Sequence, residues 1–349
     1  MKKKVSIGKT IFYLCVLEIE KGMRRLLKYG LICVLFLSFG GNLKAQVNPD
    51  FSVFWEDLYY VNPASINFNY DAYFSLATKA QWVDFPGSPV TAALTIEVPV
   101  EKLRSRFAGK LLVDRIGFTS LIDFSLSYAY SLKINKKNLF NFGLSGALQT
   151  AAYDVSKIMA DNVQDPTLYS EKINGIIEGN LSLGLEYVYD NKLFVGLSSQ
   201  NILSYITSLR KERTSPLQTP TNYLYAKYVT DYLSPNFYMD CGLRFCQYDR
   251  LGVSDFMTSF YYDLNDDYTL QCQLYGNFAL GKYDTSTDGK IGVTAGDVGF
   301  MFGINLVKDL KLLCGYNYNY AVVGYQSYGT FEIMLSYGIK HCPKCINEW

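Results

Sequence analysis

Residues 180–200 read NLSLGLEYVYDNKLFVGLSSQ, and their alternation of side chains decides the fold. Apolar or aromatic residues occupy every second position on both sides of a central Asp190-Asn191 pair. They are Leu181, Leu183, Leu185, Tyr187 and Tyr189, then Leu193, Val195 and Leu197. A period of two on each side of a turn dipeptide predicts a β-hairpin. Its apolar face would pack on a second sheet in a soluble sandwich, or would contact lipid in a membrane barrel.

The same alternation runs through most of the chain after about residue 70, with no convincing helical stripe, so the sequence predicts an all-β protein. Fourteen strands are expected, at 71–82, 90–99, 104–113, 116–132, 139–151, 176–189, 192–199, 222–231, 235–246, 255–263, 267–281, 297–307, 310–322 and 328–340. An even number of strands permits a closed sheet without edges, which a lipid environment requires.

The lengths of the predicted connections favour a membrane barrel over a sandwich. Even-numbered connections carry the tight sequences NKKN, DN, LSP, LNDD and KD, and only the one at 100–103 lacks a clear turn signal. Odd-numbered connections include the long polar stretches 151–175, 200–221 and 282–296. Outer-membrane barrels have short periplasmic turns and longer external loops. The sequence therefore predicts a transmembrane antiparallel β-barrel of about fourteen strands, with Leu181 to Tyr189 facing lipid and Ser182, Gly184 and Glu186 facing the lumen.

Composition agrees with this class. The 349 residues include 30 Tyr and 22 Phe but one His, and the net charge is +1. Tyrosine suits the boundary between hydrocarbon and water. The near-neutral charge gives no reason to expect nucleic-acid binding. Mean hydropathy is +0.02, as expected when strands alternate between lipid-facing and lumen-facing side chains.

The N-terminal region reads as an export signal. Met23 begins a stretch with three basic residues, an apolar core from Tyr29 to Phe39 and a small residue, Ala45, before the expected cleavage. The core is too short for a spanning helix. The predicted organisation is an upstream extension from a mis-called start (1–22), a signal peptide (23–45), a periplasmic N-terminal segment (46–70), one barrel domain (71–340) and a short tail (341–349).

Several blocks, in this order, resemble one family. They are NPASINF (62–68), QWVDFPGSPVTAALTIEVPV (81–100), FSLSYAYSLKINKKNLFNFGLSGALQ (124–149), LFVGLSSQNIL (193–203) and CGYNYNYAVVGYQSYGTFEIMLSYGI (314–339). Together they resemble the PorP/SprF family of type IX secretion system membrane proteins of Bacteroidetes, from about Asn48 to Ile339. The chain departs from the family pattern at Phe331, where His is usual, and in the tail at 341–349.

The resemblance implies a non-enzymatic outer-membrane barrel of the type IX secretion and gliding apparatus. Expected partners are outer-membrane lipid, periplasmic ring and trunk components, and a large secreted protein with a type IX C-terminal domain, which the barrel would help to export or anchor. The alternative is a passive channel or small-solute transporter on the same barrel. No catalytic residue and no cofactor are expected, and the partner-binding residues are unknown.

The residues offer little for catalysis. The single His is His341, in the predicted tail, so no predicted strand carries the histidine that a catalytic Ser–His pair would need. The lumen carboxylates Asp123, Glu186, Asp240 and Glu332 are expected to hydrogen-bond Arg244 or Lys340 across the lumen. Export permits disulfides, but Cys241, Cys272 and Cys314 are in phase with the apolar faces of their strands and are expected to act as small apolar side chains.

Three local motifs leave alternatives open. The tail motif HCPKC offers His341, Cys342 and Cys345 as weak metal ligands, although its interpretation as a tail with an incidental disulfide is favoured, and a redox site or partner contact are alternatives. DTSTDGKIG (284–292) begins like a calcium loop but has Ala295 where a Glu is needed, which favours an external loop. LRKERT (209–214) is expected to be a solvated loop, with a contact to a secreted partner or lipopolysaccharide as the alternative.

Overall fold

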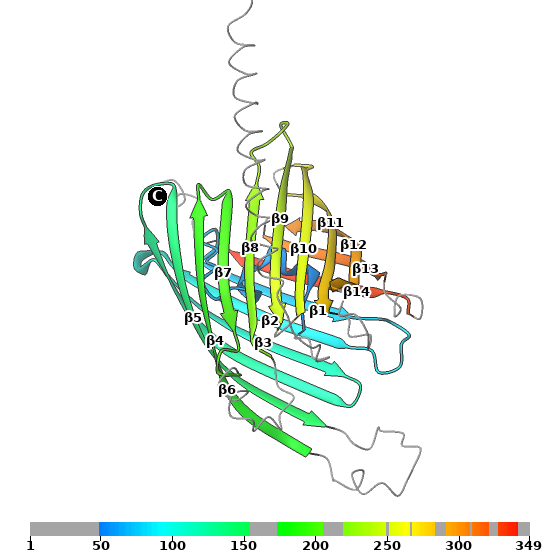
Figure 1. The fold of residues 1–349 in the computed structure, drawn as a ribbon. Helices are drawn as coiled ribbons and strands as arrows, with labels where there is room; N and C mark the ends of the chain where they lie inside the picture. Colours follow the sequence, from blue (N-terminus) through cyan, green and yellow to red (C-terminus); the bar gives the residue numbers. More distant parts are fainter. Residues whose placement is uncertain are drawn as a thin grey trace, which may run out of the picture. The chain divides into compact units, whose positions relative to one another are not determined.

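The computed structural model describes residues 49–153, 173–204, 219–248, 251–265, 267–282, 291–307, 309–320 and 327–340. All of them belong to one compact unit, Leu43–Trp349. Within these residues, fourteen antiparallel strands form a closed barrel in which each strand pairs with its neighbours in sequence, and β1 closes the ring against β14 (Figure 1). No helix in this part of the chain is long and apolar enough to cross a membrane.

The strands are β1 (Ala72–Ala80), β2 (Val90–Val100), β3 (Ser105–Ile116), β4 (Thr119–Lys133), β5 (Asn138–Tyr153), β6 (Ile173–Tyr189), β7 (Leu193–Gln200), β8 (Thr221–Val229), β9 (Phe237–Tyr248), β10 (Leu251–Asp263), β11 (Thr269–Lys282), β12 (Ile291–Val307), β13 (Leu310–Asn319) and β14 (Thr330–Ile339). Three short 3₁₀ helices accompany them: η1 (Ser52–Glu56), η2 (Leu58–Tyr60) and η3 (Glu101–Leu103).

All fourteen predicted strands are present, and the predicted barrel is confirmed. Two strands begin earlier than the sequence pattern indicated, because β10 starts at Leu251 and β12 at Ile291. Glycines interrupt the alternation there, at Gly252, Gly292 and Gly296. Because glycine has no side chain to mark a position as lipid-facing or lumen-facing, the alternation could not reveal these strand starts. The backbone still pairs in register, with Leu251 opposite Tyr248 and Ile291 opposite Lys282.

The alternation of residues 181–189 separates two faces of β6. Leu181, Leu183 and Leu185 point out of the barrel and are 39–52% exposed, whereas Ser182 and Glu186 are buried inside. Large apolar side chains are exposed in this way on strands around the barrel. A closed sheet with an apolar exterior and a polar interior is the arrangement of a barrel in a bilayer.

The two ends of the barrel differ in their connections. One end, here the short-turn end, has the connections 101–104, 134–137, 190–192, 230–236, 264–268 and 308–309. The opposite end, the long-loop end, has the connections 81–89, 117–118, 154–172, 201–220, 249–250, 283–290 and 320–329. The predicted sorting holds for the short-turn end, while the strand bounds leave two connections of only two residues, 117–118 and 249–250, at the long-loop end. The connection without a turn signal is formed by η3, which ends at Arg104 in the left-handed conformation (φ 50°).

Tyrosines mark the short-turn end on the outside of the barrel. Six outward-facing tyrosines, each 39–49% exposed, lie near the ends of their strands there: Tyr128, Tyr130, Tyr189, Tyr228, Tyr262 and Tyr337. An aromatic ring with a polar tip is favoured where hydrocarbon meets the headgroups. This ring of tyrosines places a membrane–water interface at the short-turn end.

The segment before β1 lies inside the barrel. Residues 50–69, called the plug from here on, contain η1 and η2 and occupy the lumen (Figure 1, blue, among the strands). Val53, Phe54, Trp55, Asn62 and Ala64 are fully buried there. The predicted placement of 46–70 as a periplasmic segment ahead of the barrel is therefore wrong for the plug. Its aromatic side chains find cover inside the lumen that they would lack in the periplasm.

Candidate functional site

The plug is shaped by its own short-range hydrogen bonds. The carboxylate of Asp57 accepts a hydrogen bond from Tyr59 N (3.1 Å) and so caps η2. The side-chain oxygen of Asn62 accepts from Ala64 N (2.9 Å), which turns the chain at Asn62-Pro63. These turns keep a segment without long helices or strands compact enough to fit inside the barrel.

Glycines on the inner wall allow the plug to approach the strands closely. A Cβ at Gly184 would overlap Asn62 Oδ1 and lie 3.0 Å from Ala64 N, and one at Gly143 would overlap the Pro63 backbone. A Cβ at Gly242 would lie 2.5 Å from the Trp55 ring. Glycine in a strand often marks such a close approach of another backbone or side chain. The wall of β5, β6 and β9 is therefore shaped to the plug.

Arg244 on β9 holds the first residue of the plug. Its guanidinium donates to both carboxylate oxygens of Asp50 and, through Nε, to Asp255 Oδ2 on β10 (2.6 Å). It also lies over the Phe54 ring, 3.9 Å from the centroid. Burial disfavours the charged form of Asp50, but the charge of Arg244 outweighs it and holds the pKa of Asp50 below its usual value.

Glu56 forms a second group, with side chains of β8, β11 and β13. It pairs with Lys311 on β13 (2.5 Å) and accepts a hydrogen bond from Gln271 on β11 (2.6 Å). Burial opposes its ionisation, yet the charges of Lys311 and Lys227 and these hydrogen bonds prevail and lower the pKa of Glu56 to about 2. Lys227 on β8 also donates to the Trp55 carbonyl (2.7 Å).

Asp57 and Arg106 form a third group, against β1 to β4. Asp57 accepts from Ser75 (3.1 Å) and Thr95 (2.7 Å), while burial raises its pKa. Arg106 pairs with Glu97 (3.0 Å), donates to the Pro63 carbonyl, and lies 4.2 Å from the Tyr59 ring centroid. This fully buried guanidinium therefore contacts the plug from two sides.

Asn62 and Glu332 complete the attachment. Asn62 donates to the Leu185 carbonyl (2.9 Å) and the Tyr225 hydroxyl (3.1 Å), and that hydroxyl donates to Glu186 (2.6 Å). Glu332 on β14 accepts from the backbone N–H groups of Ser52 (2.8 Å) and Val53 (3.2 Å). Polar groups from all sides of the barrel thus hold the plug, and side chains fill the lumen at this level.

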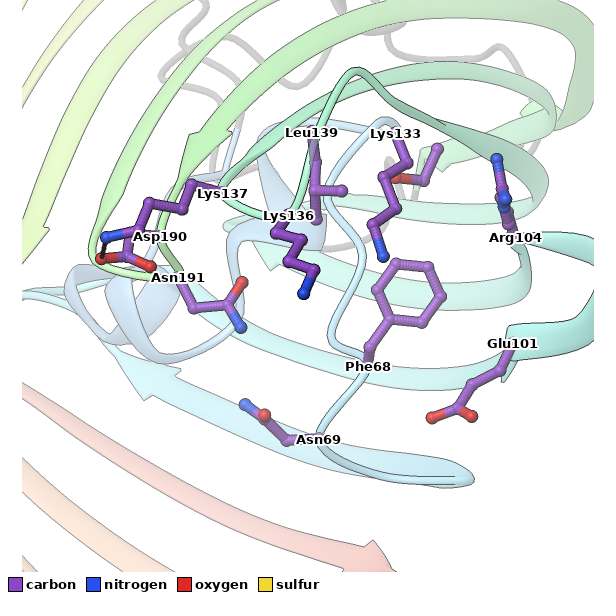
Figure 2. A pocket seen from close by; sticks show the side chains of 11 residues that line it. Phe68, Asn69, Glu101, Arg104, Lys133, Lys136, Lys137, Leu139, Asp190 and Asn191 are labelled. Carbon is purple, nitrogen blue, oxygen red and sulfur yellow. Dashed lines mark hydrogen bonds and ion pairs between the residues drawn. The ribbon is translucent and has the colours of Figure 1, made fainter. Parts of the chain in front are cut away.

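Two pockets open at the mouth of the barrel on the short-turn side, and both are walled by Phe68 and Asn69 at the end of the plug. The larger, about 320 Å³, extends inward to Glu56 and Lys227. The other, about 240 Å³, lies beneath the turns of β2–β3, β4–β5 and β6–β7 (Figure 2). Its lining is rich in cations: Arg104, Lys133, Lys136 and Lys137.

The predicted partners of the lumen carboxylates are wrong. Their actual partners are closer in the sheet or belong to the plug. Asp123 accepts from Gln149 (2.6 Å), Glu186 from Asn141 (3.0 Å) and Tyr225, Asp240 pairs with Lys227 (3.1 Å), and Glu332 holds the plug and lies 3.6 Å from Lys79. Arg244 binds Asp50 and Asp255, and Lys340 pairs with Asp309 (2.7 Å). A filled lumen leaves no open path for pairs directly across it.

Of the remaining predicted features, the strand cysteines lie within the described residues, and most of the sequence motifs do not. Cys241, Cys272 and Cys314 do face outward, and the four cysteines of the described strands, including buried Cys246, are free thiols. His341, Cys342 and Cys345, the LRKERT motif (209–214), all but the last two residues of the 284–292 motif and the predicted signal peptide lie outside the described residues. Within the described ranges, no group of three or more His, Cys, Asp or Glu side chains is placed to hold a metal ion.

Sequence reasoning missed the plug and Arg106, and it expected Arg244 to bind carboxylates of the strands without foreseeing that it holds Asp50 of the plug. The available signal was the stretch DFSVFWEDLYYVNP at 50–63, which combines many aromatic residues with three carboxylates and lacks strand alternation. Such a segment needs both an apolar cover and cationic partners. Arg106 and Arg244 stand at lumen-facing positions of predicted strands and could supply the charge.

Solved structures with a related arrangement include a Pseudomonas aeruginosa FadL homologue, with 9% identity and a TM-score of 0.46 over 79% of this chain and 92% of that chain. The Acinetobacter baumannii outer membrane protein Omp33 has 6% identity and a TM-score of 0.40 over 77% and 98%. The TodX monoaromatic hydrocarbon channel has 8% identity and a TM-score of 0.46 over 80% and 93%. No curated protein matches the sequence.

A family model, described as the type IX secretion system membrane protein PorP/SprF, matches residues 43–337. The match includes the plug and all but the last two residues of β14. This chain therefore belongs to the PorP/SprF family of type IX secretion system membrane proteins.

Proposed function

We propose that this outer-membrane barrel is a non-enzymatic component of type IX secretion that helps to export or anchor one particular secreted surface protein. Its expected partners are periplasmic ring or trunk components on one side and a large secreted protein with a type IX C-terminal domain on the other. Family membership supports the setting, and the structure bears on the choice between this role and a passive channel.

The observation that carries the proposal is the filled lumen. The plug is bonded to β9 through Arg244, to β13 through Lys311, to β3 through Arg106 and to β14 through Glu332. A passive channel needs a continuous water-filled path through the barrel. A barrel whose lumen is filled by its own chain suits a protein that works through its two rims instead.

Affinity purification tests the proposal. The full-length barrel, carrying a tag in the 283–290 connection, is purified from detergent-solubilised outer membrane, and the co-purified proteins are identified by mass spectrometry. Recovery of type IX ring components, or of one large protein with a type IX C-terminal domain, supports the role. An untagged strain processed identically is the control.

The channel alternative makes the opposite prediction. The same purified barrel is inserted into a planar lipid bilayer, and its ion conductance is recorded. A barrel that purifies alone and conducts steadily overturns the proposed role in favour of the passive channel. A barrel that purifies with partners and conducts no ions supports the proposed role.

A further inference from the structure

We infer that the cation-rich pocket at the short-turn mouth is a binding site for an acidic segment of a partner protein. The inference deepens the proposed function and rests on it, because it gives the chemistry of a partner on that side of the barrel. It is carried by the composition of the pocket, by one orphaned polar atom and by the location of the pocket inside the rim.

Positive charge dominates the pocket. Four cations, Arg104, Lys133, Lys136 and Lys137, line it against two carboxylates, Glu101 and Asp190. Asp190 is already paired with Lys137 (3.1 Å). Figure 2 shows the Lys133 and Lys136 side chains directed toward the Phe68 ring, with the Lys137–Asp190 pair set to one side. Among the described residues, the side chains of Arg104 and Lys136 form no ion pair.

Ser131 provides the independent observation. It lies on the inner face of β4, is 2% exposed and lines this pocket. Its hydroxyl is buried and has no hydrogen-bond partner among the residues that the structure describes. A buried hydroxyl normally finds a partner, since leaving it unpaired costs about 1–3 kcal/mol. A carboxylate in the pocket would accept its hydrogen bond while its charge is balanced by the lysines.

The shape of the pocket favours a peptide over a small free anion. Its volume of about 240 Å³ is many times the roughly 10–15 Å³ that a cavity needs to hold one water. The Phe68 ring and Leu139 add an apolar surface beside the cations. An acidic side chain with an apolar neighbour would satisfy both surfaces.

The location of the pocket argues against a lipid headgroup. Phe68 and Asn69 of the plug form part of its wall, so it opens within the rim of the barrel. Lipid contacts the opposite face of the strands, where Leu126, Tyr128 and Leu144 are exposed. By the predicted orientation, the short-turn end faces the periplasm, so the partner would be a periplasmic protein.

Titration calorimetry on the full-length barrel in an uncharged detergent tests the inference. The probe is a short capped peptide of alternating Glu, Gly and Phe, and the control is the same peptide with Gln in place of Glu. The Glu peptide is expected to bind, more weakly as salt rises, because the exposed charges are screened. The Gln peptide is expected to show no binding.

Substitutions locate the binding. The Lys133→Glu/Lys136→Glu double variant should lose at least about tenfold in affinity, because two attractive charges become repulsive. Lys340→Glu reverses one charge at the same end of the barrel outside this pocket. It is therefore the matched control for Lys136→Glu alone, and its affinity should stay within about twofold of the wild type. Ser131→Ala should lose about threefold. If the double variant fails to fold, exposed Lys136→Glu alone replaces it, with a loss of about threefold expected.

Equal binding of the Glu and Gln peptides would overturn the inference, as would a loss in Lys340→Glu equal to that in the double variant. Co-purification separates the two proposals. If the wild type and the double variant recover the same partners, the pocket inference fails and the proposed function stands. If the wild type recovers none, the proposed function fails, and the calorimetry still decides whether the pocket binds acidic peptide.

Discussion

Replacing Arg244 by methionine should loosen the plug more than any other single lumen substitution. Arg244 is 2% exposed, and its guanidinium is the cationic partner of Asp50 and Asp255. Methionine fills similar volume but leaves both carboxylates unpaired. Removing one partner of a buried ion pair costs roughly 3–5 kcal/mol. That range would shift the balance between the plugged and unplugged barrel by roughly 10² to 4 × 10³-fold.

Two assays measure this effect. The temperature at which the folded barrel loses its fast migration on a detergent gel should fall in Arg244→Met. Conductance in a planar bilayer should rise as unplugged barrels become populated. Lys192→Met is the matched control, because Lys192 pairs with Asp231 (2.5 Å) on the surface and such pairs contribute about 1 kcal/mol or less.

A compensated variant sharpens the test. Adding Asp50→Asn and Asp255→Asn to Arg244→Met removes the unpaired charges, so much of the lost stability should return. The reasoning is refuted if Arg244→Met melts and conducts like the wild type. It is also refuted if the compensated variant is no more stable than Arg244→Met alone.

Three further predictions test other parts of the structure. Gly184→Ala should destabilise the barrel by about 1–3 kcal/mol through overlap with Asn62, whereas Gly146→Ala, where a Cβ would meet nothing within 4 Å, should be nearly neutral in the same thermal assay. The pKa of Glu56 is about 2 against the usual 4.5, so its ion pair should contribute its full stability above about pH 4.5 and lose it as the pH falls through about 2. Glu56→Gln should remove this part of the acid dependence, and the plot of melting temperature against pH should become flatter. Leu183→Arg, which puts a charge on the lipid face, should cost up to about 2–4 kcal/mol and reduce the folded fraction in membranes, and a folded yield equal to that of Leu183→Ala would contradict the lipid-facing assignment.

The strands could be predicted from the sequence because each residue of a barrel strand faces one of two solvents. Lipid outside and polar groups inside impose a period of two that single residues such as Leu183 and Glu186 display directly. The prediction was weakest where glycine removed the side chain, at the starts of β10 and β12. The placement of strand ends there depends on backbone pairing, which leaves no mark in the side-chain pattern.

The plug could not be placed from the sequence because its partners are far away along the chain. Asp50 meets Arg244, and Ser52 meets Glu332, 280 positions later. A local pattern contains no information about such pairs. The same limit explains why the carboxylates of the lumen were expected to pair across open space. In the structure the plug occupies that space, and Glu332 accepts hydrogen bonds from its Ser52 and Val53.

The contacts of the plug also bear on how the barrel assembles. Its Asp57 is bonded to Ser75 on β1, while its Ser52 and Val53 are bonded to Glu332 on β14. One segment therefore joins the first and last strands of the ring from within, in addition to their own ladder. Bringing together residues so distant in sequence is slow, because the loop must close before any contact forms. A plug that had folded against β1 would present the N–H groups of Ser52 and Val53 to Glu332 as β14 completes the ring.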